Sequence, residues 1–331
     1  MAQKNPIMKK GKSVPLSQNK MIGHFLALGF YLIVAYALFL AASNMNYIWK
    51  WNSIPKYFAY EQVISIEAKH DGVLKEEDGK YFILSDENVK EDLKLTSDYI
   101  FEYEVGEDVY MGDAIASKTE LKAGPMIQGI WVTIKISVLS AILTLIIGVL
   151  LAFMKLSSYQ FLKDIASVYI AVIRGTPLLV QIFLFYFIVA NIFEIERFYA
   201  GVLSLGIFFG AYMAEVLRGA IQSIDRGQLE AAQSLGMSYN QTMIHIILPQ
   251  AFKRALPTLV GEMIALVKDS SLVSVISITD LTKVGREIVA NTFSPFETWI
   301  VVALMYLCIT FSLSYLGHVL EKRMTAKGGI N

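Results

Sequence analysis

The stretch Glu230-Ala231-Ala232-Gln-Ser-Leu-Gly236, followed ten residues later by Ile246-Ile-Leu248-Pro249, decides the interpretation of this chain. It is polar and rich in small residues, and it lies between long apolar runs. Its two alanines allow another surface to approach a helix closely. Its last glycine tolerates a positive φ and can separate two short helices, and the proline disturbs a continuing helix. The segment is therefore predicted to be a helical loop that leaves a membrane and contacts a partner.

Composition indicates a membrane protein. The chain has 331 residues, of which 55% are hydrophobic, and its formal net charge is zero. Its apolar runs reach about 20 residues, the length a helix needs to cross a bilayer. The sequence predicts an all-α membrane protein with about six transmembrane helices, near 21–42, 126–154, 177–195, 200–222, 258–277 and 297–320.

The first of these runs follows five lysines and could imitate a secretory signal. Its apolar core is longer than the roughly 7–15 residues of a signal peptide, so an uncleaved span is preferred. Cleavage after Leu40-Ala41-Ala42 stays open as an alternative. The predicted organisation is a cytoplasmic tail (1–20), a first span (21–42), an extracytoplasmic insert (43–124), a permease core (125–323) with a loop at 226–249, and a cytoplasmic tail (324–331).

Charge distribution predicts the orientation. Residues 43–124 hold 17 of the 29 acidic residues, with 9 lysines and no arginine. The N-terminus, the 155–163 link, the 218–257 loop and the C-terminal tail carry basic residues. Because cytoplasmic loops are enriched in Lys and Arg, both termini are predicted to be cytoplasmic and 43–124 extracytoplasmic. Asp71-Gly72 and Asp78-Gly79 are turn signals between alternating runs, so this insert is predicted to be small and β-rich.

A break is required between Tyr159 and Phe193. One helix of this length would be about 50 Å long, against a hydrocarbon core of roughly 30 Å. Gly175-Thr-Pro177 is the predicted break, with Pro177 in the first turn of the next helix. Residues 159–173 are then expected to lie along the cytoplasmic interface.

The sequence lacks the motifs of an enzyme. Gly11-Lys12-Ser13 has Pro6 where a phosphate-binding loop needs glycine, and it precedes a membrane span. The four histidines have no metal-ligand spacing. No catalytic residue, metal or cofactor is predicted in this chain, so any energy from ATP must come from a partner.

Three further segments carry a family resemblance: Arg174–Gln181, Ala211–Gln222 and Lys268–Ser274. Together with the loop they resemble the polar-amino-acid branch of ABC-importer permeases, from about Gly124 to Arg323. The resemblance implies that fold, a second permease subunit as homodimer or heterodimer, a cytoplasmic ATPase dimer that binds ATP and Mg, and an extracytoplasmic amino acid binding protein. The implied contacts with the ATPase are Glu230, Ala231, Ala232, Gly236, Leu248 and Pro249.

Charged residues inside spans supply the next prediction, because an ionisable group in lipid is costly and usually faces a cavity or a partner. Glu215 either lines a pathway or pairs with Arg174 or Arg218. Lys268 and Asp269, expected near mid-depth in a span that starts at Pro257, are predicted to line the pathway in preference to bracing helices. The pathway candidates are Gln181, Tyr212, Glu215, Lys268, Asp269 and Ser270. The predicted structural residues are Arg174, Pro177 and Arg218.

The function expected from the resemblance is import of a polar amino acid across the cytoplasmic (inner) membrane, driven by ATP hydrolysis in a separate subunit. Two alternatives are a secondary amino acid transporter and a membrane-anchored sensor that uses residues 43–124. A secondary transporter should show repeated, broken helices with its own coupling site, and a sensor would not need five further spans.

Overall fold

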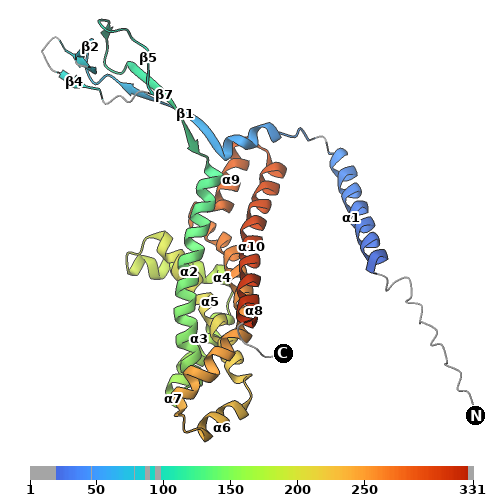
Figure 1. The fold of residues 1–331 in the computed structure, drawn as a ribbon. Coiled ribbons are helices and arrows are strands. Elements are labelled where there is room, and N and C mark those ends of the chain that lie inside the picture. The colour runs from blue at the N-terminus through green and yellow to red at the C-terminus, as the bar shows by residue number, and fades with distance from the viewer. Residues whose placement is uncertain (1–19, 46, 78, 86–89, 94–97, 327–331) are drawn as a thin grey trace, which may run out of the picture. The chain divides into compact units, whose positions relative to one another are not determined.

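A computed structural model describes residues 20–45, 47–77, 79–85, 90–93 and 98–326. Most of the predicted N-terminal tail and the end of the predicted C-terminal tail lie outside the described residues. The chain forms two compact units, Met1–Trp49 and Lys50–Asn331. The first holds helix α1 (Lys20–Ser43), drawn in blue in Figure 1. This helix is apolar and long enough to cross a membrane, and its side chains are exposed along nearly its whole length.

The second unit is built around helices. In chain order they are α2 (Pro125–Leu156), α3 (Gln160–Arg174), α4 (Leu178–Leu184), the π-helix η3 (Phe185–Ala190), α5 (Arg197–Gln222), α6 (Arg226–Ser234), α7 (Tyr239–Thr242), the π-helix η4 (Met243–Ile247), α8 (Leu248–Asp269), the 3-10 helix η5 (Ser270–Ile276), α9 (Leu281–Thr292) and α10 (Pro295–Ala326). The helical content agrees with the predicted fold class.

Helices α2 and α5 pack closely side by side and run in the same direction. Ser140 Oγ donates to the Val202 carbonyl at 3.4 Å, and Thr144 Oγ1 donates to the Gly206 carbonyl at 3.5 Å. A Cβ added at Gly206 would lie 2.5 Å from the Leu143 side chain. Small residues thus let the two backbones approach, which is how helices associate where lipid offers no hydrophobic driving force.

The described residues between 59 and 123 form seven strands: β1 (Ala59–Glu67), β2 (Gly72–Glu77), β3 (Lys80–Leu84), β4 (Lys90–Asp92), β5 (Ile100–Phe101), β6 (Asp108–Val109) and β7 (Ala114–Ala123). They make two antiparallel sheets, in the orders β1-β7-β5 and β4-β3-β2-β6. Gly79, in a predicted turn, joins β2 to β3 with φ of 72°. Leu74, Ile83 and Ile115 are fully buried in the core of this insert.

The insert begins and ends on the helical core. The 3-10 helix η2 (Trp51–Tyr57) precedes β1, and Ile54 packs with Met126 of α2 and Leu281 of α9. The buried Glu297 carboxylate, in the first turn of α10, accepts a hydrogen bond from the Lys50 amide. The base of the insert is therefore held by α2, α9 and α10.

The predicted break between α3 and α4 is present, and the two helices are bent by 106°. Pro177 is the residue before α4 instead of part of its first turn, with φ of −65° and ψ of 137°. Extended backbone at this position turns the chain between the two helices, and proline has no amide hydrogen to leave unpaired.

The helix that holds the start of the predicted 258–277 span begins before Pro257. Helix α8 begins at Leu248 and continues through Pro257, so Lys268 and Asp269 are its last two residues. Ser270 Oγ lies 3.3 Å from Ser137 Oγ, and Ser137 is about 18 Å along α2 from its start. The mid-depth position of Lys268 and Asp269 stays a prediction.

Within the part of the chain that the structure describes, four helices, α1, α2, α5 and α10, are long and apolar enough to cross a membrane, and the bent pair of α3 with α4 and η3 could make a fifth. Helix α8 is not among them because it carries five charged residues in 22. The six-span count therefore stays a prediction.

Candidate coupling and translocation site

Local sequence shapes the predicted coupling segment, α6 to η4. The Asp225 carboxylate accepts a hydrogen bond of 2.7 Å from the Gly227 amide and caps α6. Gly236 follows the helix with φ of +81°, a left-handed conformation that favours glycine. Ser238 and Gln241 form a reciprocal capping box that starts α7. The turn is thus defined by two side-chain caps and one glycine.

The surface that this segment exposes differs from the predicted contact surface for the ATPase. Glu230 and Ala231 are exposed, but Ala232 is only 5% exposed, so its methyl group packs inside the chain. Leu235, which the sequence reasoning passed over, is 83% exposed beside the glycine turn. The signal that could have identified Leu235 was a large apolar residue next to the glycine that ends a mostly polar helix.

The segment is tied to helix α8. Arg254 of α8 donates to the Ser223 carbonyl just before α6, and Gln250 Nε2 donates to Gln228 Oε1 at 3.3 Å. Leu248 is half-buried, and Pro249 is exposed in the first turn of α8, where a missing amide hydrogen has little cost. A displacement of α6 is therefore expected to move α8.

Glu215 has basic partners on two helices. Arg218 Nη2 lies 2.7 Å from Glu215 Oε2, and Lys155 Nζ of α2 lies 3.7 Å from Glu215 Oε1. Arg218 also donates to Gln222 at 2.6 Å. Of the predicted alternatives, pairing with Arg218 is present. Lys155 was missed because the register of α2 against α5 is not visible in the sequence.

Arg174 lies over the ring of Tyr212, with its Cζ 5.0 Å from the ring centroid. Its charge also acts on Glu215 and on Glu262 of α8. Arg174 therefore ends α3 at a point where side chains of α5 and α8 come together. Its guanidinium is exposed and can reach a ligand as well as the Tyr212 ring.

Helix α8 presents charges without such pairing. Within the part of the chain that the structure describes, the side chains of Glu262, Lys268 and Asp269 make no hydrogen bond or ion pair. Glu262 and Asp269 are seven residues apart and so share a helical face. An unpaired charge inside a membrane protein is a candidate for ligand contact.

Two pathway candidates are buried instead. Gln181 is 4% exposed, and its Nε2 donates to the Ile173 carbonyl and to Thr176 Oγ1, each at 2.7 Å. It thus braces the bend between α3 and α4. Ser270 is fully buried and donates to the Val267 carbonyl at 2.8 Å, which suits packing of α8 on α2.

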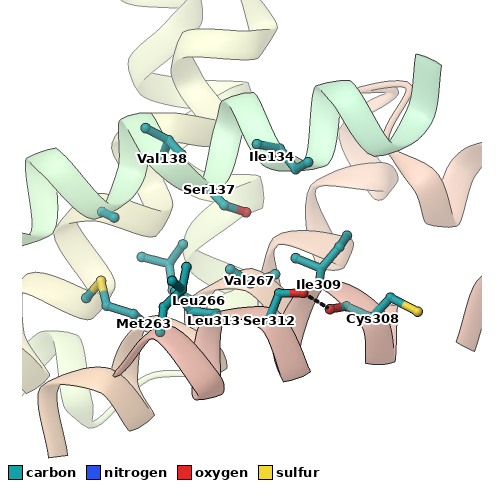
Figure 2. Close-up of a pocket in the computed structure, with 12 residues that line it drawn as sticks. Ile134, Ser137, Val138, Met263, Leu266, Val267, Cys308, Ile309, Ser312 and Leu313 are labelled. Carbon is teal, nitrogen blue, oxygen red and sulfur yellow. Dashed lines mark hydrogen bonds between the residues drawn. The ribbon is translucent and has the colours of Figure 1, made fainter. Parts of the chain in front are cut away.

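An apolar cavity of about 520 Å³ lies between α2, α8 and α10 (Figure 2). Ser137, Leu266 and Cys308 are among its lining residues, and the Ser312 hydroxyl donates to the Cys308 carbonyl within α10. Because its hydroxyl groups are few and Ser312 is already bonded, this cavity does not suit a charged amino acid. Figure 2 shows neither Lys268 nor Asp269 among the lining side chains.

A second buried polar group lies at the start of α9. The Asp280 carboxylate accepts hydrogen bonds from the amides of Thr282 and Lys283 and from the Tyr306 hydroxyl. Burial raises the pKa of the Asp280 carboxyl. This group joins α9 to α10, and its helix-capping signal, an aspartate before Leu281-Thr-Lys, was readable in the sequence.

Long apolar helices, a capped polar loop and unpaired charges in one helix are features expected of a membrane transport component. The model of the family described as "Binding-protein-dependent transport system inner membrane component" matches residues 109–326, and the chain belongs to this family. Relatives in this class are permease subunits, which are not themselves enzymes.

Two relatives give the degree of similarity. The chain is 37% identical over 201 residues to the arginine transport system permease protein of Bacillus subtilis, with 60% of this chain and 92% of the relative covered. It is 42% identical over 202 residues, with the same coverage, to the glutamine transport system permease protein of Escherichia coli strain K12.

Solved structures agree with this family. An amino acid ABC transporter crystallised with histidines matches with a TM-score of 0.56 and 42% identity, over 60% of this chain and 94% of that chain. The methionine ABC transporter in an inward-facing conformation matches with a TM-score of 0.52 at 16% identity, over 60% and 95% of the two chains, and shares the fold.

Proposed function

We propose that this chain is the permease subunit of an ABC importer that moves a polar amino acid into the cytoplasm. The observation that carries the proposal is the 37–42% identity to permeases named for arginine and glutamine transport, over nearly their whole length. The energy would come from ATP and Mg bound by a partner ATPase.

Coupling would run through α6. Glu230, Ala231 and Leu235 form an exposed surface beside the Gly236 turn, and this surface would enter a cleft of the ATPase. Leu235 offers an apolar anchor and Glu230 a charge. The hydrogen bonds from Arg254 and Gln250 to the α6 region would pass the movement to α8.

The substrate would contact α8. A zwitterionic amino acid needs an anion for its ammonium group and a cation for its carboxylate. Glu262 and Asp269 supply acids, and Lys268 and Arg174 supply bases, without a strong ion pair among them. Glu215 is less suited, because Arg218 and Lys155 already neutralise its carboxylate.

The insert would face the extracytoplasmic side, where a binding protein delivers substrate. Its acidic excess and the basic character of the α6 side support this orientation, and both termini would then be cytoplasmic. A second permease subunit, identical or different, would complete the translocation unit.

Co-purification tests this proposal against the alternatives. An affinity-tagged chain, purified from its native host, is expected to retain an ABC ATPase through size exclusion. The variant Leu235→Asp should lose the ATPase while the permease stays folded, because its side chain is exposed. A secondary transporter or a sensor would purify without an ATPase, and that result would contradict the proposal.

A further inference from the structure

A second cavity, of about 960 Å³, opens between the C-terminal end of α2, the start of α3 and the segment α7–η4. Its wall is apolar and includes Leu150 and Phe153 of α2 and Ile244 of η4, which are 59%, 45% and 59% exposed. Two polar residues, Ser158 at the α2–α3 corner and Asn240 of α7, also line the cavity. The cavity is thus amphipathic.

Lys163 is the one charged residue that lines this cavity among the described residues. Its ammonium group makes no hydrogen bond or ion pair with them. The neighbouring acid, Asp164, accepts a hydrogen bond from Gln160. Lys155, at the end of α2, is held by Glu215 and Ser167. The lining of the cavity therefore carries a positive charge that the described residues do not neutralise.

We propose that this cavity binds an anionic phospholipid, with the phosphate at Lys163 and Ser158 and an acyl chain along Phe153 and Ile244. A lipid would pair its phosphate with the Lys163 ammonium group and cover the apolar wall with an acyl chain, whereas free phosphate would leave the apolar wall exposed to water. Basic pockets between helices on the cytoplasmic side bind acidic headgroups, and this cavity adjoins α7, on the side predicted to be cytoplasmic.

Bound lipid would connect two parts of the transport machinery. Helix α7 and η4 lead from α6 to α8, and α6 contacts η4. A lipid between this segment and the α2–α3 corner would brace the coupling segment from its membrane side. Headgroup charge would thereby influence coupling without contact with the ATPase or the substrate.

The test is lipid retention by the purified complex of permease and ATPase in neutral detergent, measured by native mass spectrometry. Phosphatidylglycerol and phosphatidylcholine with identical acyl chains are added separately. The wild-type complex should retain phosphatidylglycerol in preference. Lys163→Gln should weaken that retention about five-fold, because one lysine at an anionic surface contributes a factor of this order.

Two variants control for charge and chemistry. Lys163→Arg should keep the preference. Lys253→Gln removes the same charge from an exposed position of α8 outside this cavity and should retain the lipid as the wild type does.

Ser158→Glu is a second test of the site, and it should weaken lipid retention. It places an acid at an exposed position near the N-terminus of α3, where an acid favours the helix. Weaker retention by Ser158→Glu would therefore not reflect unfolding.

Equal retention of the two lipids, or wild-type retention by both Lys163→Gln and Ser158→Glu, would overturn the proposal. Displacement of the lipid by millimolar inorganic phosphate would also overturn it, since it would identify a free-anion site. Lipid retention is measured without transport, so failure here leaves the proposed import function untouched.

Discussion

Replacing Gly236 with valine tests coupling through the α6 turn. The glycine has φ of +81°, and an added Cβ would meet nothing within 4 Å. The penalty of the substitution is therefore a backbone penalty and not a clash. A left-handed conformation costs an ordinary residue roughly 1–2 kcal/mol, and a β-branched side chain is disfavoured further.

This penalty is small against the 5–15 kcal/mol that stabilises a typical domain. It is large for one exposed turn, because 1–2 kcal/mol changes a conformational ratio by about 5–30-fold. Gly236→Val is therefore expected to insert and accumulate normally while the turn leaves its native shape. Substrate-stimulated ATP hydrolysis by the assembled complex should then be abolished or strongly reduced.

The assay is ATPase activity in vesicles that hold permease, ATPase and binding protein, with and without amino acid. Gly219→Val is the matched control. Gly219 is also exposed and has open space around its Cα, but it lies inside α5, outside the left-handed region. Full stimulation in Gly236→Val, at normal abundance, would refute the reasoning.

Three further predictions concern topology, the pathway and packing. In a background free of the native cysteine, Glu76→Cys of the insert should react with an impermeant maleimide from outside intact cells or spheroplasts; labelling only after lysis would reverse the orientation. Asp269→Asn should lower uptake or change the preference between acidic and basic amino acids while the ATPase stays bound; unchanged uptake and ranking would remove this carboxylate from the pathway. Gly206→Ala should destabilise the permease by about 1–3 kcal/mol, because the new methyl group would overlap Leu143, and Gly219→Ala should stabilise it by up to about 1 kcal/mol; equal melting temperatures would contradict the packing of α2 on α5.

Much of the helical core could be predicted from the length of the apolar runs in the sequence. The runs predicted at 126–154, 200–222 and 297–320 agree with α2, α5 and α10 within a few residues, since an apolar run of this length has few other solutions. The start of α8 was not predictable in this way. A proline is tolerated inside a membrane helix where neighbouring groups bond the backbone carbonyl that it frees. Pro257 is exposed and lies inside α8, so it does not mark an end.

The site was predictable where local chemistry dominates and unpredictable where distant helices meet. A glycine between two short helices predicts a positive φ at Gly236, and its φ is +81°. The partner of Glu215 on α2 depends on how two helices align, which no local pattern encodes. Burial of Gln181 and Ser270 likewise depends on neighbouring helices, so their polarity alone suggested a pathway that their hydrogen bonds do not favour.

The central claim is that this permease moves an amino acid with energy from ATP in a partner subunit. Its most direct test is uptake of labelled glutamine and arginine into vesicles that hold the complete complex, with binding protein outside and ATP inside. We expect accumulation of at least one of them that requires internal ATP and persists when ion gradients are collapsed. Accumulation driven by an ion gradient in the absence of ATP would contradict the account.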